Sequence, residues 1–219
     1  EPTEIIISQN NTNITCNGLN DGTAFLVNLS GGTPYTVGDP YTYLWDDASG
    51  QTTQIATGLS PGTYTCTVLD SNSCPLVTTS VTIIEPSVIT TDPTTHLDIT
   101  CNGFNDGTAT VVNPLGGTPH TVGFAYTYLW DDPLAQTTQT ATGLVPGTYT
   151  CTVSDSNSCS VVTSSVTITE PSVLSADTAH VNVSCYGLSD GAAIVTPSGG
   201  TPYTAGSPYT YLWSPAGQT

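Results

Sequence analysis

The chain has 219 residues, contains no Lys or Arg, and carries 17 Asp and Glu, which give it a formal net charge of −17. No Lys or Arg salt bridge can therefore form, and nucleic acid is excluded as a partner because binding to phosphates needs basic side chains. No apolar run approaches the roughly 18 residues that span a bilayer, so membrane insertion is not expected.

The cysteine content and the first residue point to an exported protein. Seven Cys in a chain of this composition favour an oxidising, extracellular compartment, because disulfides persist there. The chain begins at Glu1 rather than Met and shows no signal peptide. We therefore expect a processed product or a piece of a longer chain.

Internal repetition organises the chain. The triplet Cys16-Asn17-Gly18 returns 85 residues later as Cys101-Asn102-Gly103, and 84 residues after that as Cys185-Tyr186-Gly187. A unit of this length is too long for a solenoid repeat and is typical of a separate domain. We predict domains arranged as beads on a string: a first repeat over residues 1–85, a second over 86–170, and the front part of a third over 171–219.

The first repeat is predicted to be a succession of short strands. In chain order, the extended segments cover residues 4–7 with 13–16, then 23–28, 41–45, 52–57, 63–68 and 76–84. Alternation of apolar and polar residues, as around Tyr64, Cys66 and Val68, is typical of half-buried strands. Six or seven strands, about 8–12 residues apart, predict an all-β fold of tandem immunoglobulin-like β-sandwich domains. Trp45 is expected to fill the core.

The segment from Pro61 to Cys74 returns from Pro146 to Cys159 with one change and carries a second sandwich signature. Tyr64 follows a Pro-Gly turn and lies two residues before a Cys on the same face, as in a tyrosine corner. That arrangement predicts that the Tyr64 hydroxyl bonds to backbone upstream of it. The alternative is an ordinary hairpin with an inward Tyr.

Five motifs recur in one order in both complete repeats: Cys-Asn-Gly-x-x-Asp-Gly, Gly-Gly-Thr-Pro, Tyr-Thr-Tyr-Leu-Trp, Pro-Gly-Thr-Tyr-Thr-Cys-Thr-Val and Asp-Ser-Asn-Ser-Cys. This set resembles the SprB-type repeat of giant surface adhesins of gliding Bacteroidetes. The resemblance covers both complete repeats and the front half of the third. It implies an exported, cell-surface or filamentous protein that leaves by type IX secretion. The loop Thr33–Pro40 is longer than the family's usual loop, and Cys66 is an additional cysteine.

The resemblance also implies a disulfide pattern, because the family usually has two Cys per repeat. It implies two bridges within repeats, Cys16–Cys74 and Cys101–Cys159. Cys66 and Cys151 are then left as buried, small hydrophobic residues. Pairing of Cys16 with Cys66 stays open, since it would mimic the bridge between the sheets of immunoglobulin domains. No Cys-x-x-Cys pair is present, so no transition-metal site is expected.

Recurrent acidic loops are candidate calcium sites, because calcium prefers oxygen ligands. A bridge between the first and last cysteines of a repeat would bring together the loops that carry these acids. The candidates are Asp21 with Asp70, and Asp106 with Asp155. A turn is the simpler interpretation of each Asp-Gly. Calcium is therefore one expectation for a cofactor, and no cofactor is the other.

Glycosylation signals occur along the chain. Four Asn residues satisfy the pattern Asn-x-Ser/Thr, and one Thr lies in an Asp-Thr-Ala acceptor like that used for O-glycans in Bacteroidetes. The candidates are Asn10, Asn13, Asn28, Asn182 and Thr178. Chance matches in a Thr-rich chain are the alternative.

No catalytic pattern emerges, and we expect no enzymatic activity. His96, His120 and His180 do not occupy equivalent repeat positions with a partner Ser and Asp. Metalloprotease, esterase and phosphate-loop motifs are absent from the sequence.

We therefore expect a structural and adhesive segment of a long extracellular repeat protein or filament. Its expected partners are copies of itself or neighbouring repeats, and surface polysaccharide. The alternative is a carbohydrate-binding module with Tyr35, Tyr41, Tyr43 and Trp45 as an exposed stacking platform, which requires Trp45 to be exposed. Residues 171–219 supply only the front strands of a sandwich, so we expect an exposed apolar face and a chain that continues, with strand complementation by a neighbour as the alternative.

Overall fold

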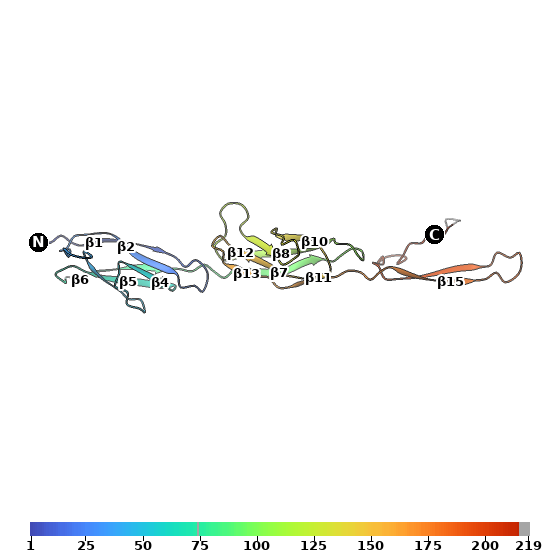
Figure 1. Cartoon of the computed structure of the whole chain (residues 1–219), viewed down its shortest axis with the longest axis horizontal. Coiled ribbons are helices and arrows are strands. Elements are labelled where there is room, and N and C mark those ends of the chain that lie inside the picture. Colours follow the sequence, from blue (N-terminus) through green and yellow to red (C-terminus); the bar gives the residue numbers. More distant parts are fainter. Residues whose placement is uncertain (74, 215–219) are drawn as a thin grey trace. The chain divides into compact units, whose positions relative to one another are not determined.

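The computed structural model describes residues 1–73 and 75–214, and every regular element within them is a β-strand (Figure 1). Side chains alternate between core and solvent along these strands. In β2 (Gly22–Ser30), for example, Ala24 and Leu26 are buried, whereas Phe25 and Val27, on the other face of the strand, are partly exposed. The predicted all-β, immunoglobulin-like fold is confirmed.

Six strands of the first repeat form two three-stranded sheets. One sheet has the order β1-β2-β4 and contains β1 (Ile6–Thr12) and β4 (Ile55–Leu59) beside β2. The other has the order β3-β5-β6 and consists of β3 (Thr42–Trp45), β5 (Gly62–Leu69) and β6 (Pro75–Ile83). All of these pairings are antiparallel. The chain thus crosses from one sheet to the other and back, as in an immunoglobulin sandwich.

Buried side chains of both sheets form the core of the first repeat. Trp45 is only 2% exposed and lies in one cluster with Leu26, Val68 and Ile83. Its indole N–H donates a hydrogen bond of 2.9 Å to the Thr53 carbonyl, so the polar end of the ring is satisfied inside the fold. The predicted role of Trp45 as a core residue is confirmed.

The tyrosine corner is present in both complete repeats. The Tyr64 hydroxyl donates to the Ser60 carbonyl at 2.9 Å, and the Tyr149 hydroxyl donates to the Val145 carbonyl at 3.0 Å. Both bonds run to backbone four residues upstream, as predicted. The alternative of an ordinary hairpin is therefore set aside.

The second repeat follows the same plan with shorter final strands. Its sheets have the orders β10-β8-β7, β13-β12-β9 and β11-β14. The strands are β7 (Thr90–Leu97), β8 (Gly107–Leu115), β9 (Thr127–Trp130), β10 (Thr140–Leu144), β11 (Gly147–Tyr149), β12 (Cys151–Ser154), β13 (Ser160–Val162) and β14 (Val166–Ile168). Where the first repeat has the long strands β5 and β6, the second has the pairs β11 with β12 and β13 with β14. The breaks lie near Thr163, a buried residue whose hydroxyl accepts a hydrogen bond from the Cys151 N–H.

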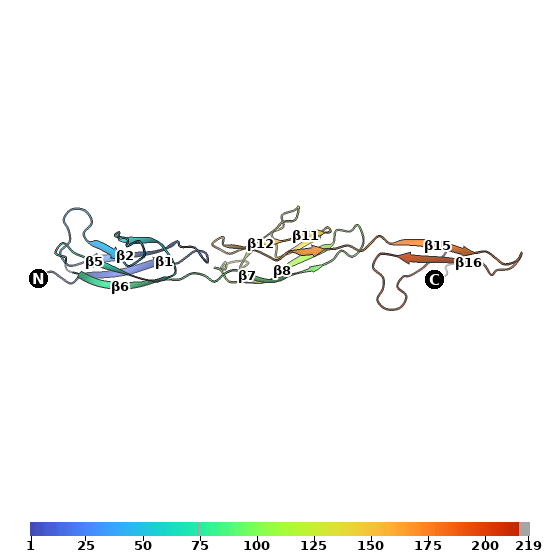
Figure 2. The ribbon, with the colours of Figure 1, turned by 90° about the horizontal axis from the view of Figure 1, so that it is seen from below.

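The described part of the third repeat contains one antiparallel hairpin, β15 (Ser175–Val181) with β16 (Ala192–Ser198), visible side by side in Figure 2. Ala193 is exposed, although its equivalent Ala109 is completely buried in the second repeat. Ile194 is also exposed, whereas its equivalent Thr110 in the second repeat is only partly exposed. The hairpin thus presents apolar side chains that a complete sandwich would cover.

By its internal contacts the chain forms two compact units. One comprises residues 1–90 with 114–126 and 154–161, and the other contains the rest of the described chain. Two loops of the second repeat therefore belong with the first repeat. The repeat boundaries inferred from the sequence stay a prediction, because these units do not follow the sequence step.

Replacement of Tyr149 by Phe tests the tyrosine corner. The Val145 carbonyl would lose its donor, so we expect Tyr149→Phe to lower the free energy of unfolding by about 1 kcal/mol. Urea denaturation followed by tryptophan fluorescence measures this change. Tyr35→Phe, at an exposed position, is the matched control and should leave the unfolding curve in place.

Candidate functional site: the junction between repeats

The linker after the first repeat is held by the Cys-Asn-Gly loop of that repeat. The Gly18 N–H donates to a carboxylate oxygen of Glu85 at 2.9 Å, and the Asn17 side-chain amide donates to the Pro86 carbonyl at 3.0 Å. Gly18 has φ +80°, a conformation that glycine adopts without strain. The loop therefore turns back onto the end of its own repeat.

The same linker is held on its other side by the glycine pair of the second repeat. The Gly117 N–H donates to the Ser87 carbonyl at 2.8 Å. A Cβ atom on Gly116 would lie 2.0 Å from the Val88 carbonyl oxygen, so only glycine fits there. We call the linker 85–89, together with the loops 15–18, 116–118 and 155–159, the first junction.

Asp155 fixes the last of these loops. This carboxylate is 2% exposed, and its Oδ2 accepts the Thr118 N–H at 2.7 Å. Its Oδ1 accepts the N–H groups of Asn157 and Cys159, both at 2.9 Å. Three N–H donors around one carboxylate satisfy its negative charge although no cationic side chain is present. Cys159 is consequently held at a defined position beside the glycine pair.

A disulfide between Cys16 and Cys159 closes the first junction. The two Cα atoms are 5.6 Å apart, within the usual range for disulfides, and 143 residues separate the two Cys along the chain. Beside the bond, the Asn157 side-chain amide donates to the Thr15 carbonyl at 3.0 Å. Loop 15–18 of the first repeat and loop 155–159 of the second are therefore joined covalently and by hydrogen bonding.

This bond contradicts the predicted pairing of Cys16 with Cys74 and of Cys101 with Cys159, and also the alternative of Cys16 with Cys66. Cys66 is a free, buried thiol, and Cys101 is a free, exposed one. Cys74 itself lies outside the described residues. The prediction that Cys66 and Cys151 are buried is confirmed.

The length of the last strand explains why a bridge within a repeat is wrong. β6 begins at Pro75, directly after the Asp-Ser-Asn-Ser-Cys segment, and ends near Glu85, where the Cys16 loop binds. Nine residues of strand cover about 30 Å, whereas a disulfide needs Cα atoms within about 7 Å. The two motifs lie at opposite ends of one repeat.

The acids proposed as calcium ligands bond to the protein's own donors. Asp21 accepts the Thr15 N–H at 3.1 Å and the Thr15 hydroxyl at 2.5 Å, and Asp106 makes the same bonds to Thr100. Asp70, like Asp155, is buried and accepts the Thr33 N–H at 2.9 Å. The expectation that one repeat brings Asp21 close to Asp70 is wrong, since their loops lie at opposite ends. In the described part of the chain, no three His, Cys, Asp or Glu side chains gather as metal ligands. Calcium binding itself stays a prediction.

The proposed aromatic platform is also contradicted. Tyr41, Tyr43 and Trp45 are buried, and the Tyr41 hydroxyl donates to the Gly31 carbonyl at 2.8 Å. Only Tyr35 of the proposed four is exposed. Aromatic residues at alternate positions of β3 point into the core because one face of this strand is covered by the other sheet.

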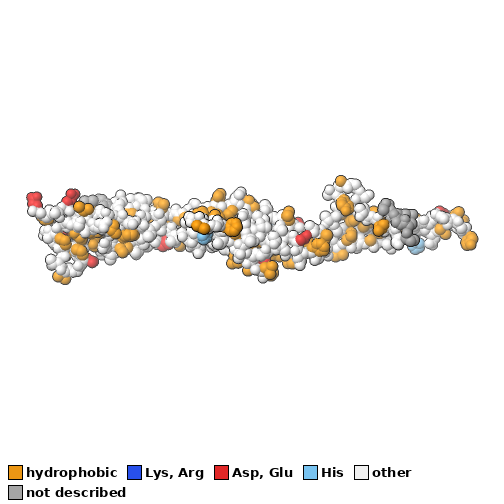
Figure 3. Space-filling view, turned by 90° about the horizontal axis from the view of Figure 1, so that it is seen from above, with side chains coloured by type: hydrophobic (Ala, Val, Ile, Leu, Met, Phe, Trp, Pro, Cys, Tyr) orange, Lys and Arg blue, Asp and Glu red, His pale blue; other side chains and the backbone are white. Residues whose placement is uncertain are grey.

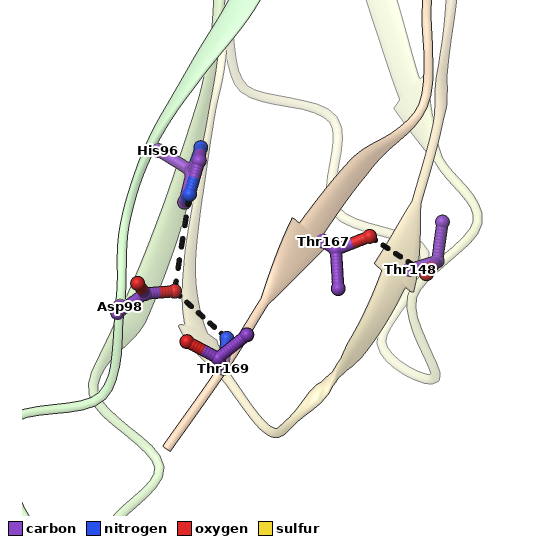
Figure 4. Close-up of polar contacts among 5 residues, drawn as sticks. All are labelled: His96, Asp98, Thr148, Thr167 and Thr169. Carbon is purple, nitrogen blue, oxygen red and sulfur yellow. Dashed lines mark hydrogen bonds and ion pairs between the residues drawn. The ribbon is translucent and has the colours of Figure 1, made fainter. Parts of the chain in front are cut away.

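Among the three histidines, His96 lies beside a carboxylate that has a structural role. His96 lies 3.8 Å from Asp98, whose carboxylate accepts the Thr169 N–H at 2.7 Å (Figure 4). That hydrogen bond, with a smaller effect of His96, lowers the pKa of Asp98. Asn13 plays the same part in the first repeat, since its side-chain oxygen accepts the Ile84 N–H. Asp98 and Asn13 thus each bond the segment after the first strand of a repeat to the end of the last strand of the same repeat.

All five candidate glycosylation residues are exposed: Asn10, Asn13, Asn28, Thr178 and Asn182. The face drawn in Figure 3 shows mainly uncharged polar and hydrophobic surface with scattered carboxylates. Exposure makes these residues accessible to a transferase, and their glycosylation stays a prediction. Within the described residues no helix is long and apolar enough to span a membrane.

The sequence comparison settles the family. The model of the SprB repeat matches residues 8–50, 94–135 and 178–218, which together make up more than half of the chain. The chain belongs to the SprB repeat family. Each match begins within or near the first strand of a repeat and ends past the Trp of the Tyr-Thr-Tyr-Leu-Trp motif. Among curated proteins, no relative matches this SprB repeat chain.

Two solved structures are similar to the chain at low identity. One contains the three N-terminal domains of the bacteriophage RB49 highly immunogenic outer capsid protein (Hoc), with 15% identity and a TM-score of 0.42, covering 89% of this chain and 69% of that one. The other is a C-terminal 282-residue fragment of intimin in complex with the intimin-binding domain of the translocated intimin receptor. It has 17% identity and a TM-score of 0.37, and covers 81% of this chain and 67% of that one.

Sequence reasoning missed the residues that hold the linker. Asn17 and Glu85 recur as Asn102 and Glu170. The Asn102 side-chain amide donates to the Pro171 carbonyl at 3.0 Å, and the Glu170 carboxylate accepts the Gly103 N–H at 2.8 Å. Their recurrence at the repeat step was the signal that could have found them. This recurrence indicated a shared role, but it did not show that the Cys-Asn-Gly loop and the Glu-Pro linker are in contact.

Cysteine accessibility and peptide mapping test the junction. We expect digestion of the unreduced protein with a Glu/Asp-directed protease to yield Cys16 linked to Cys159. Alkylation of the native protein should label Cys101 and Cys185 and spare Cys66 and Cys151, because burial raises the pKa of each of these two thiols to about 11. Recovery of Cys16 on any other cysteine would contradict the structure.

The acidic loops predict a loss of stability in acid. Hydrogen bonds from Thr100, first from its hydroxyl and then from its N–H, lower the pKa of Asp106 in the folded state. The stabilisation is therefore complete above the unfolded pKa of about 4 and is lost as the pH falls through the folded value. We expect Asp106→Asn to melt below the parent at neutral pH and to converge with it in strong acid. Asp177→Asn, on the exposed hairpin, should follow the parent throughout.

Proposed function

We propose that this chain is a structural and adhesive segment of a long extracellular repeat protein, in which the sandwiches carry load along a covalently closed series of junctions. The observation that carries the proposal is the Cys16–Cys159 disulfide between successive repeats. A tensile force that enters at Glu1 reaches Cys16 and passes through this bond to Cys159. The residues between them are bypassed, so they need not unfold when the chain is pulled.

The hydrogen bonds of the junction support the same role. The linker carbonyls and the Glu85 carboxylate are bonded on both sides, by Asn17 and Gly18 and by Gly117. Flexible linkers between independent domains lack such bonds. A linker that is held at each end transmits force and limits bending, as a fibre or stalk requires.

Membership of the SprB repeat family and the disulfide both favour the cell surface as the site of action. We infer that neighbouring repeats or copies of the chain are its main partners, that surface polysaccharide is a further partner, and that export occurs by type IX secretion from a member of the Bacteroidetes. Calcium would balance part of the negative charge of a surface without basic residues, and N- and O-glycans would cover part of that surface. We propose no enzymatic activity, since Asp98 beside His96, and Asp21 and Asp106 in the acidic loops, accept hydrogen bonds from backbone N–H and Thr hydroxyl groups.

Force spectroscopy on the full chain, held by handles at its two ends, tests this proposal. With the disulfide closed, the fully unfolded chain should be shorter than the reduced one by roughly 500 Å, at about 3.6 Å for each of the 143 residues of separation. Cys16→Ser should give the long extension without reductant, and Cys185→Ser, as matched control, the short one. Equal extensions before and after reduction would show that the junction carries no load.

A further inference from the structure

The groove beside Cys16 and Cys159 has an equivalent one repeat later that lacks the incoming loop. The first groove is lined by Cys16, Asn17, Ser87 and Val88, and by Cys159 with its two following residues. The second is lined by the repeat equivalents Cys101, Asn102, Ser172 and Val173, and by Gly200 and Thr201. We call this region the second junction. All of its lining residues come from the second and third repeats, and none of them corresponds to loop 155–159 of the first junction.

The receiving side of the second junction is fully formed. Asn102 donates to the Pro171 carbonyl at 3.0 Å, Gly103 donates to Glu170 at 2.8 Å, and Gly200 donates to the Ser172 carbonyl at 2.8 Å. The corresponding bonds of the first junction differ from these by no more than 0.1 Å. The Cys101 loop is thus presented in the same manner as the Cys16 loop, and its thiol is free and exposed.

A backbone acceptor marks where the missing loop belongs. In the first junction the Thr15 carbonyl accepts the Asn157 amide, which also contacts the Thr118 hydroxyl at 3.3 Å. In the second junction the equivalent Thr100 carbonyl accepts the Thr201 hydroxyl at 3.2 Å. Thr201 is the repeat equivalent of Thr118, so a hydroxyl that serves the asparagine in one junction bonds directly to the carbonyl in the other.

We propose that Cys101 forms an inter-repeat disulfide with the cysteine of an Asp-Ser-Asn-Ser-Cys loop on a further copy of this repeat, the copy that completes the third sandwich. This loop is the expected occupant, because the equivalent groove of the first junction holds such a loop and both complete repeats carry it in an identical sequence. Its asparagine would displace the Thr201 hydroxyl from Thr100, as Asn157 bonds to Thr15. The inference concerns the chemistry of the second junction and does not rest on an adhesive role.

The bond forms by exchange with a disulfide oxidant such as oxidised glutathione. The Cys101 thiolate attacks glutathione disulfide and releases one glutathione, and the thiolate of the second cysteine then attacks the mixed disulfide and releases the other. Two thiols lose two protons and two electrons, and one glutathione disulfide becomes two glutathione thiols. Cys101 can take the first step because it is exposed.

Repeated disulfides of this kind would interlock. The first encloses a separation of 143 residues, whereas the repeat step is 85, so Cys101 lies inside the loop that Cys16–Cys159 closes. A second disulfide starting at Cys101 would therefore overlap the first instead of following it. After reduction of the first bond, residues 102–158 would still lie inside the loop that the second bond closes.

An extended chain tests the proposal. A copy of residues 138–170 is appended after Thr219 of the full chain. Gln218-Thr219 is the repeat equivalent of Gln136-Thr137, so the added segment continues the third repeat in register. The copy carries Val162→Ile, so that its peptides differ in mass from the originals. The chain is refolded with oxidised and reduced glutathione and digested without reduction. We expect Cys101 to be linked to the added copy of Cys159 while Cys16–Cys159 is retained. In the unextended chain, Cys101 should instead carry glutathione.

Matched variants complete the design. Cys101→Ser in the extended chain should leave the added cysteine alkylatable, whereas Cys185→Ser should leave the new linkage unchanged. Recovery of Cys101 as a free thiol, or linked to Cys185, in a chain that holds Cys16–Cys159 would overturn the proposal. The same mapping on material from the producing cells decides the question where the extended chain does not fold, since the native peptide carrying Cys101 must then be linked to a Ser-Asn-Ser-Cys peptide.

Discussion

The carboxylates that close the loops of this chain are stabilised by hydrogen bonds, and the fold of these loops depends on that constraint. With no Lys or Arg, a buried or loop-closing acid can be satisfied only by N–H and O–H donors. Asp155 takes three backbone N–H groups, Asp21 takes two donors from Thr15, and Glu85 takes one from Gly18. The bonds from Thr118 to Asp155 and from Gly18 to Glu85 join separate segments, and the others fix the turn of a single loop. The acids thereby position the glycine pair, the Cys-Asn-Gly triplet and the linker that together make the junction.

Disulfide topology follows from where those loops lie on a sandwich. The Cys-Asn-Gly loop precedes β2 and the Asp-Ser-Asn-Ser-Cys segment precedes β6, and the length of a strand separates the two ends. A cysteine at one end of a sandwich can meet only what the neighbouring repeat presents there. The bond therefore forms between repeats, and it converts two marginally stable small domains into one cross-linked unit, in which loop closure further restricts the unfolded chain.

The sequence was sufficient to predict the sandwich because its signals are local. Alternation around Tyr64 and Cys66, the Pro-Gly turn and the spacing to Trp45 each reflect contacts within one repeat. Strand ends were less certain, and β4 covers Ile55–Leu59 where residues 52–57 were expected. The junction could not be predicted in this way. The segments Asp70–Cys74 and Asp155–Cys159 have identical sequences, so no local pattern can tell which of them Cys16 meets. The burial of Tyr41 and Tyr43 likewise depends on the second sheet.

Burial of two cysteines helps the chain to choose among its possible pairings. Seven Cys permit many disulfides, and exchange requires a thiolate. Cys66 and Cys151 are completely buried, and burial raises the pKa of each to about 11, so at neutral pH only about one thiol in ten thousand is ionised. Folding of a sandwich therefore withdraws its central cysteine from exchange and leaves those at its two ends. Since the ends of a repeat are too far apart to react with each other, the exposed cysteines of a folded sandwich are directed to adjacent repeats.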